Sequence, residues 1–250
     1  MIRVEADGPV AVVTMADGKA NAMDTAMCRE LTARFGELAG SGHRAAVLTG
    51  EGHIFSAGVD LKQLRDGGTA YLDEFLPALS EAFLAVFNCA LPVVAAVNGH
   101  AIAGGCILTS ACDHRVMNAG HGHIGVTELL VGVPFPVTPM EILRFAVGTH
   151  RLKELAYFGR TYPAARALEL GLIDEAVPAE SVLERALAVA AEFASLPAEA
   201  LRHTRHQLRV PALDRIARER PATDGLVHRI WDSPVARDKI REYVAKTLDS

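Results

Sequence analysis

The sequence has 250 residues, a formal charge of −5 and an apolar fraction of one half. This composition is typical of a soluble globular protein and excludes a disordered or fibrous chain. Because the charge is mild and the basic residues are scattered, we expect neither nucleic acid nor a membrane as a partner.

The N-terminal segment and the cysteines indicate the compartment. The first five residues lack the long apolar region of a signal peptide, and no internal apolar segment is long enough to cross a membrane. The cysteines form neither a CxxC pair nor a zinc-binding spacing. We therefore expect a cytoplasmic protein with reduced thiols and no metal site. The four cysteines are Cys28, Cys89, Cys106 and Cys112.

The predicted elements follow from the spacing of apolar residues. Residues 2–15 read as a pair of strands, and helical spacing begins after Asn21. Residues 45–50 form a short buried strand. A helix over 70–89, a strand over 92–97, a glycine-rich turn and a helix over 104–112 follow.

Strands that alternate with helices predict an α/β domain with largely parallel strands. From about Pro139 onward only helical patterns remain, interrupted by glycines and prolines. We expect an α/β core over residues 1–190 and a C-terminal helical region over 191–250 that belongs to the same domain. Within that region the basic stretch Arg202–Arg209 predicts a solvated helix face.

Two glycine-containing turns follow predicted strands and precede predicted helices. The first spans residues 50–61 and the second spans residues 98–106. Glycines let the backbone approach a ligand closely, and the first N–H groups of a helix lack partners. Neither turn has the spacing of a dinucleotide fingerprint or a P-loop. Together they suggest a hole for an anion.

Several segments together resemble the crotonase, or enoyl-CoA hydratase/isomerase, superfamily. They are Ala20–Met23, FSAGVDL at 55–61, AAVNGHAIAGGC at 95–106, Ala111–Asp113, TELLVG at 127–132 and the segment 159–174. The resemblance implies the crotonase (ClpP-like) fold, with repeated ββα units and a C-terminal helical trimerisation region. It also implies an acyl-CoA thioester substrate, no separate cofactor because coenzyme A is part of the substrate, and a homotrimer or hexamer.

The resemblance also assigns catalytic positions. It implies an oxyanion hole formed by the backbone N–H groups of Ala57 and Gly104, which is a large catalytic contribution in such sites. Of the two catalytic glutamates of family hydratases, the second falls on Glu128 and the first on Ile107, which cannot exchange a proton. Apolar neighbours would raise the pKa of Glu128 toward the range of a general base.

One carboxylate beside an oxyanion hole is similar to the pattern of the 3,2-enoyl-CoA isomerases of the family. The alternatives are an enoyl-CoA hydratase or another crotonase-type lyase and, from a different class, a non-catalytic acyl-CoA binding protein. The expected substrate-binding residues are Ser56, Gly58, Asp60, Leu61, Gly105, Ile107 and Phe135. The expected contacts to coenzyme A are Lys19, Ala20, Lys62, Tyr243 and Lys246.

Overall fold

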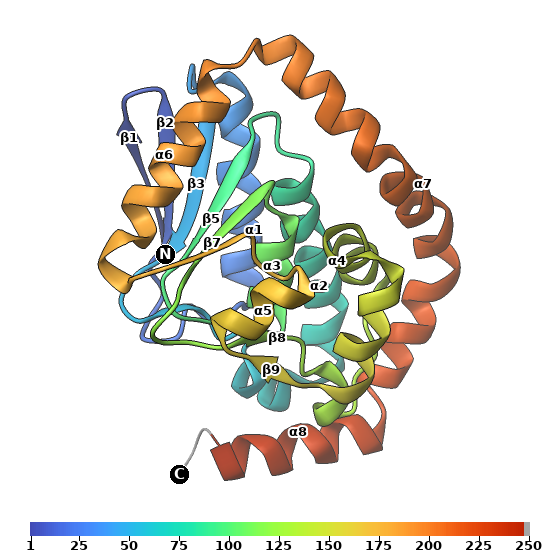
Figure 1. The fold of residues 1–250 in the computed structure, drawn as a ribbon. Coiled ribbons are helices and arrows are strands. Elements are labelled where there is room, and N and C mark those ends of the chain that lie inside the picture. The colour runs from blue at the N-terminus through green and yellow to red at the C-terminus, as the bar shows by residue number, and fades with distance from the viewer. Residues whose placement is uncertain (248–250) are drawn as a thin grey trace.

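The computed structural model describes residues 1–247 and contains two β-sheets surrounded by helices (Figure 1). The larger sheet has six strands in the order β1-β2-β3-β5-β7-β10. The predicted pair over residues 2–15 is its antiparallel edge, and every other neighbouring pair is parallel. Its strands are β1 (Ile2–Asp7), β2 (Val10–Met15), β3 (Ala45–Gly50), β5 (Val93–Val97), β7 (His114–Asn118) and β10 (Glu175–Val177).

Three strands of the smaller sheet, β4, β6 and β8, each follow a strand of the larger sheet in the chain. The order of the smaller sheet is β4-β6-β8-β9, and only β8 and β9 are antiparallel. Its strands are β4 (Ile54–Ser56), β6 (His100–Ile102), β8 (Ile124–Gly125) and β9 (Thr161–Tyr162). A strand of each sheet followed by a helix occurs three times, which confirms the predicted ββα repeat. Because β4 and β6 are neighbours, the starts of the helices that follow them lie close together.

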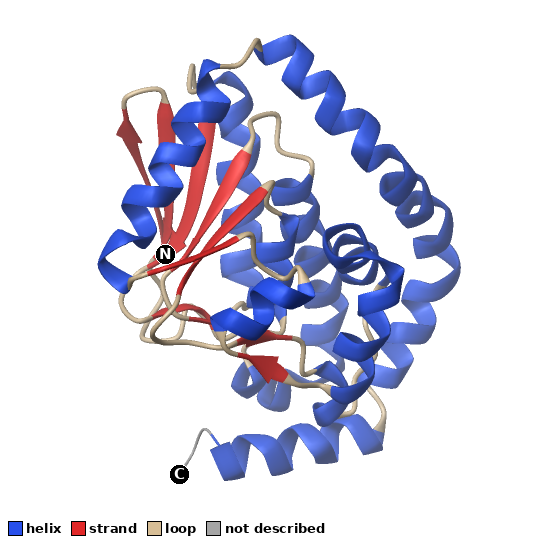
Figure 2. Cartoon of the chain, in the orientation of Figure 1, coloured by secondary structure: helices blue, strands red, loops and turns tan. Residues whose placement is uncertain are grey.

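Helices make up most of the remaining chain and cover the sheets, as Figure 2 shows. They are α1 (Thr25–Glu37), α2 (Leu61–Phe87), α3 (Gly104–Ala111), α4 (Val137–Phe158), α5 (Ala164–Leu170), α6 (Val182–Ser195), α7 (Ala198–Trp231) and α8 (Pro234–Thr247). Three short 3-10 turns are η1 (Leu38–Gly40), η2 (Glu128–Val131) and η3 (Ala179–Ser181). Among the described residues, no helix is both long and apolar enough to cross a membrane.

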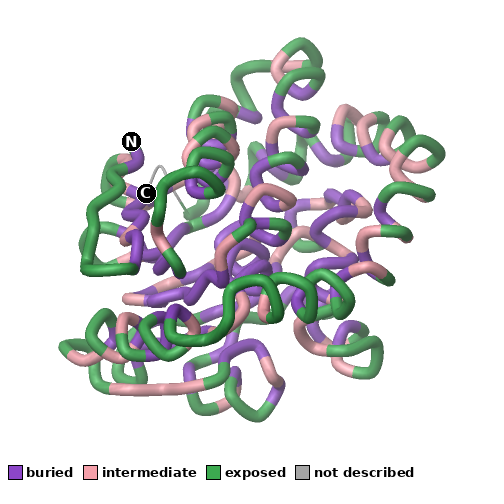
Figure 3. The backbone as a smooth tube through the Cα atoms, turned by 90° about the horizontal axis from the view of Figure 1, so that it is seen from above, coloured by how far each residue is buried: buried purple, intermediate pink, exposed green. Residues whose placement is uncertain are grey.

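The inner strands β2, β3, β5 and β7 of the larger sheet are buried on both faces, whereas the edge strand β1 is mostly exposed, and successive residues of a strand face opposite sides. On β3, Ala45 and Val47 pack with residues of α6, whereas Ala46 and Leu48 pack with residues of α1, α2 and α3. Figure 3 shows that the backbone in the interior of the molecule belongs mostly to buried residues and that exposed residues lie on the outside. The rigid sheet therefore supports the helix ends that carry the site.

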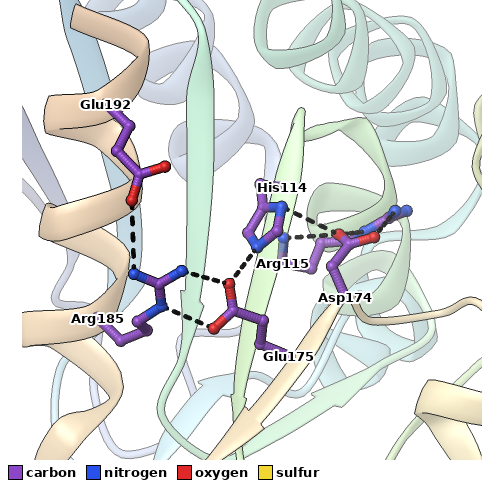
Figure 4. A network of polar contacts seen from close by, with 6 residues as sticks. All are labelled: His114, Arg115, Asp174, Glu175, Arg185 and Glu192. Atoms are coloured by element: carbon purple, nitrogen blue, oxygen red, sulfur yellow. Dashed lines mark hydrogen bonds and ion pairs between the residues drawn. The ribbon is translucent and has the colours of Figure 1, made fainter.

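Ion pairs attach the last strand to the sheet and to α6 (Figure 4). The Glu175 carboxylate on β10 accepts hydrogen bonds of 2.7 and 2.9 Å from Arg185 on α6 and lies 3.0 Å from the His114 ring on β7. The Arg185 hydrogen bonds lower the pKa of Glu175. Next to them, Arg115 makes a bidentate contact to Asp174 at 2.8 and 2.9 Å.

Three sequence predictions need correction. The chain after Pro139 is not only helical, because β9 and β10 each complete an edge of a sheet. Helix α2 begins at Leu61 rather than near residue 70, with a break at Gly68, whose φ is +63°. The stretch Arg202–Arg209 is not a fully solvated face, because Arg205 and Arg209 are buried.

Candidate active site

The segment between β4 and α2 is held against the start of α3 by close backbone contact. The buried Ser56 hydroxyl donates to the Asn21 carbonyl at 2.8 Å and accepts from the Gly58 N–H at 3.1 Å. Gly58 has a φ of +83°, and a Cβ there would lie 2.5 Å from the Ile102 carbonyl oxygen and 3.0 Å from the Gly104 nitrogen. Only glycine therefore lets these two segments meet.

The hydrogen bonds of this segment determine which N–H group is free. The Ala57 N–H donates to the Ala20 carbonyl at 2.9 Å. Met23 forms a parallel bridge with Val59 by bonding to the Gly58 carbonyl and the Asp60 N–H, at 2.8 and 3.0 Å. The Val59 N–H therefore points away from Met23, and it donates to no described residue. The assignment of Ala57 as a donor is thus corrected: its N–H is already used, and that of Val59 is available.

The second free N–H lies at the start of α3. Ala103, just before the helix, has a φ of +49°, and its N–H donates to the Gly125 carbonyl at 2.8 Å. The Gly104 N–H then opens the helix without an acceptor, as first-turn groups do. All eight residues of α3 are buried, so water screens the positive end of its dipole poorly. The free N–H groups of Gly104 and Val59 belong to the two segments that meet at Gly58.

Glu128 is the first residue of η2 and follows the end of β8 by three residues. Its carboxylate atom Oε2 is out of contact with solvent and has no hydrogen-bond partner within residues 1–247. Burial raises the pKa of Glu128 from 4.5 to about 7, and the N–H groups of Thr127 and Glu128 itself lower it by a smaller amount. Such a carboxyl group can accept and return a proton near neutral pH. The Glu128 carbonyl accepts from the Val133 N–H at 3.1 Å, which fixes the turn.

Glu128, Val59 and Gly104 line one cavity of about 410 Å³. Its walls come from the two glycine-containing segments, α2, α3, the segment 131–139 and the C-terminal helices. Most of the lining is apolar, so a bound acyl chain would be surrounded by carbon. The apolar side chains are Leu61, Leu79, Phe83, Ile102, Ile107, Val131, Val133, Phe135, Pro136, Pro139 and Trp231.

Most of the predicted site residues meet at this cavity. Those that line it are Ala20, Ala57, Asp60, Leu61, Lys62, Gly104, Ile107, Glu128, Phe135 and Tyr243. The Asp60 side chain accepts from the Lys62 and Gln63 N–H groups at 2.9 and 3.1 Å, so it caps α2. Ile107 is buried on α3.

The other predicted residues lie outside the cavity lining. Ser56 and Gly58 shape the first segment, and a Cβ on Gly105 would lie 2.4 Å from the Ser56 carbonyl oxygen, so Gly105 permits close packing. Lys19 and Lys246 are exposed and do not line the cavity. Lys246 lies three residues beyond the lining residue Tyr243 on α8.

Sequence reasoning missed Val59 and Trp231. Val59 stands within the motif that was recognised, but the availability of its N–H depends on the pairing with Met23. Trp231 is the only tryptophan of the chain and ends α7. Its Nε1–H donates to the Pro134 carbonyl at 2.9 Å, which ties the C-terminal helices to the segment beside Phe135. No local pattern marks this contact, because 97 residues separate its partners.

Known proteins resemble the whole chain. The family model described as enoyl-CoA hydratase/isomerase matches residues 5–247. The mitochondrial enoyl-CoA delta isomerase 1 of Rattus norvegicus is 28% identical over 97% of this chain and 83% of its own length. A putative enoyl-CoA hydratase of Thermus thermophilus is 37% identical over 83% of each chain.

Among solved structures, human mitochondrial delta3-delta2-enoyl-CoA isomerase superimposes with a TM-score of 0.94 at 26% identity, covering 99% of this chain and 98% of its own. The family match extends over the glycine-containing segments, Glu128 and the C-terminal helices alike. The chain therefore belongs to the enoyl-CoA hydratase/isomerase family.

Proposed function

We propose that the protein is a 3,2-enoyl-CoA isomerase that uses Glu128 as its only acid–base group. The observation that carries this proposal is the buried, unpartnered Oε2 atom of Glu128 in a largely apolar cavity. The other carboxylate that lines the cavity, Asp60, is used as the cap of α2. Relatives named as isomerases and as hydratases are both similar to this chain, so the choice between the two activities depends on the site.

The thioester carbonyl oxygen would accept hydrogen bonds from the N–H groups of Val59 and Gly104. Both donors are backbone groups without another acceptor, and the contact at Gly58 holds their segments together. Charge that develops on the oxygen during enolisation is stabilised by such fixed donors, and loss of one costs roughly 10²–10³ in rate.

The proton moves between two carbons of the substrate. The Glu128 carboxylate removes a proton from C2 of a 3-enoyl-CoA, and the electron pair of that C–H bond passes into a dienolate. The protonated Glu128 then delivers the same proton to C4, the double bond moves to C2–C3, and the carboxylate is restored. A pKa of about 7 suits both steps, because neither protonation state is strongly favoured at neutral pH.

Ile107 supports isomerisation over hydration. Hydration needs a second polar group to hold the attacking water, and Ile107 offers only carbon at its place in the lining. An apolar wall also excludes water from the dienolate. Hydratase activity, or binding without turnover, is therefore an alternative result of the test rather than the preferred function.

Coenzyme A would lie at the mouth of the cavity. Ala20, Lys62 and Tyr243 line the cavity, and Lys19 and Lys246 are close to them in sequence. We propose these five residues as contacts of the coenzyme, and a homotrimer or hexamer in the cytoplasm as the state of the protein. The thioester carries its own coenzyme A, so the chemistry requires no further cofactor.

The test is an absorbance assay of the purified protein with 3-hexenoyl-CoA and, separately, with crotonyl-CoA. We expect wild type to form the conjugated thioester from 3-hexenoyl-CoA and to leave crotonyl-CoA unhydrated. Glu128→Gln should lower the isomerisation rate by roughly 10²–10⁴, the usual contribution of general acid–base catalysis. Glu154→Gln, which changes a glutamate outside the cavity, is the matched control and should retain full activity.

Two results would contradict the proposal. Hydration of crotonyl-CoA that depends on Glu128 would identify a hydratase and show that another group replaces the missing carboxylate. Tight thioester binding without turnover, unchanged in Glu128→Gln, would identify a non-catalytic binding protein.

A further inference from the structure

A second cavity, of about 590 Å³, lies between the first half of α7 and the end of α2. It shares no lining residue with the catalytic cavity. One wall is the segment Asn88–Ala90. The other is a face of α7 whose residues recur three or four apart, as one side of a helix does. These residues are Glu199, Arg202, His203, Arg205, His206 and Arg209.

At the inner end of this cavity, which we define by the buried Arg205 and Arg209, both arginines bind one carboxylate that is not itself part of the lining. Arg205 makes two hydrogen bonds of 2.8 Å to Asp113, and Arg209 makes one of 2.8 Å to the same carboxylate. Arg205 uses its remaining Nη1 group on the carbonyls of Cys89 and Ala90, at 3.2 and 3.4 Å. Asp113 therefore neutralises only one of the two buried positive charges.

Arg209 has donor groups that no acceptor among the described residues uses. The residue is only 3% exposed, and its guanidinium lies over the Phe87 ring at 4.8 Å. Its Nε and Nη1 groups donate to no described residue, yet neither is sealed from solvent. Arg209 is one of the residues that line the cavity. A buried guanidinium with unused donors favours a negatively charged partner.

The rim adds charge of the same sign. Arg202 is exposed and forms no ion pair with a described residue, and the exposed His203 and His206 lie beside it. The opposing group on the rim is Glu199. Three guanidiniums, those of Arg202, Arg205 and Arg209, therefore stand against two carboxylates, those of Glu199 and Asp113, which leaves an excess of positive charge.

We infer that this cavity is a binding site for a small oxyanion of the phosphate class, held by Arg209 at its inner end and by Arg202 and His206 at its rim. A planar guanidinium matches the oxygens of phosphate, sulfate or a carboxylate. The site is independent of the acyl-CoA chemistry, so its occupation is measured by binding alone.

The experiment is calorimetric titration of inorganic phosphate into the full chain at constant ionic strength near pH 8. We expect one phosphate per chain, bound by the arginine side chains that line the cavity. The double variant Arg202→Ala/His206→Ala, which leaves the buried Arg205–Asp113 pair intact, should weaken binding at least about tenfold. The control Arg218→Ala removes an exposed arginine of the same helix outside the cavity and should bind like wild type.

Parallel titrations with sulfate and malonate separate the sources of the oxyanion. Sulfate binding with the same loss in the double variant supports a general oxyanion site, and malonate binding with that loss extends it to carboxylates. Equal phosphate affinity in wild type and the double variant would overturn the inference, as would no binding of any of the three anions. Chain association that the double variant abolishes, without anion binding, would show that a second copy occupies the cavity instead and would also overturn it.

Discussion

Asp113 and Glu128 are both carboxylates inside the protein, but their surroundings are opposite. Asp113 accepts from Arg205, Arg209 and the Val93 N–H, so charged donors hold it in place. Glu128 has an Oε2 atom with no donor, and burial raises the pKa of its carboxyl group to about 7. A carboxylate held by charged donors serves the fold, whereas one without such donors can exchange a proton. The partners, rather than depth alone, separate a structural acid from a chemical one.

The largest expected effect comes from removing the charge of Asp113. Asp113→Asn leaves two buried guanidiniums without a counter-charge, and breaking a buried pair in this way costs about 3–5 kcal/mol of unfolding free energy. Denaturant unfolding monitored by circular dichroism measures the loss. Glu219→Gln, which disrupts the exposed pair with Arg218, should change stability by less than about 1 kcal/mol. A similar small change in Asp113→Asn would remove the distinction between the two carboxylates.

For Glu128 we expect a change of stability in the opposite direction: removing its charge should raise the stability of the fold rather than lower it. Its folded pKa of about 7 lies above the unfolded value near 4.5, so the native state retains a proton that the unfolded state loses. Stability is therefore lost as the pH rises from about 4.5 to 7, by up to about 3 kcal/mol. Glu128→Gln should be more stable than wild type near pH 8, and this advantage should disappear near pH 4. Unfolding at the two pH values measures the difference; a Gln variant that is less stable near pH 8 would contradict it.

The same pKa predicts the pH dependence of catalysis. The general base must be ionised, so kcat/KM of wild type should fall as the pH drops below about 7. Rates with 3-hexenoyl-CoA between about pH 5 and 9 test this. A profile that remains flat down to pH 5 would mean that Glu128 is paired in the working enzyme.

A smaller effect is expected from the close backbone contact at Gly58, which holds together the two glycine-containing segments of the catalytic cavity. In Gly58→Ala the new Cβ meets the Ile102 carbonyl and the Gly104 nitrogen, and φ is already +83°. The two donors should move apart, which lowers kcat by about 10²-fold, an amount similar to the loss of one oxyanion donor. Gly36→Ala, at a helical glycine with open space around it, serves as the control. Normal kcat in Gly58→Ala would show that the donors do not depend on this contact.

The smallest effect is expected from the hydrogen bond between Trp231 and Pro134 in the wall of the catalytic cavity. Trp231→Phe retains most of the ring but removes the donor to Pro134, which should cost about 1 kcal/mol of stability. Trp231→Ala should also enlarge the cavity and shift the preference toward longer acyl chains. Activity profiles over enoyl-CoA chain lengths measure the shift, and an unchanged profile would place the acyl chain away from Trp231.

Much of the fold follows from local pattern. The hairpin at residues 2–15, the strands at 45–50 and 92–97 and helix α3 agree with the apolar spacing. Strand β10 was missed because its three residues are defined by pairing with β7 and by the Glu175–Arg185 contact rather than by their own sequence. The start of α2 was placed too late because Gly67 and Gly68 interrupt the helical pattern.

The residues discussed for the two cavities also divide into those that a local sequence motif predicts and those that depend on distant contacts. Gly104, Ile107 and Glu128 line the catalytic cavity as expected, because their motifs are contiguous in sequence, and their catalytic roles stay predictions. Arg209 was taken for a surface residue because its partner, Asp113, lies 96 residues away. The sequence predicted a free N–H at Ala57 rather than at Val59, because hydrogen bonds to Ala20 and Met23 decide which N–H is free and single-sequence motifs do not reveal such bonds.

Trp231 has one more consequence. As the only tryptophan, it supplies nearly all of the indole fluorescence of the chain, and it lies in the wall of the catalytic cavity. Its emission is therefore an intrinsic optical reporter of that cavity, which needs no label. Acyl-CoA analogues can be titrated against this signal in the catalytically impaired Glu128→Gln protein, so that occupancy is observed without turnover. Phosphate should leave the signal unchanged, because the second cavity contains no tryptophan.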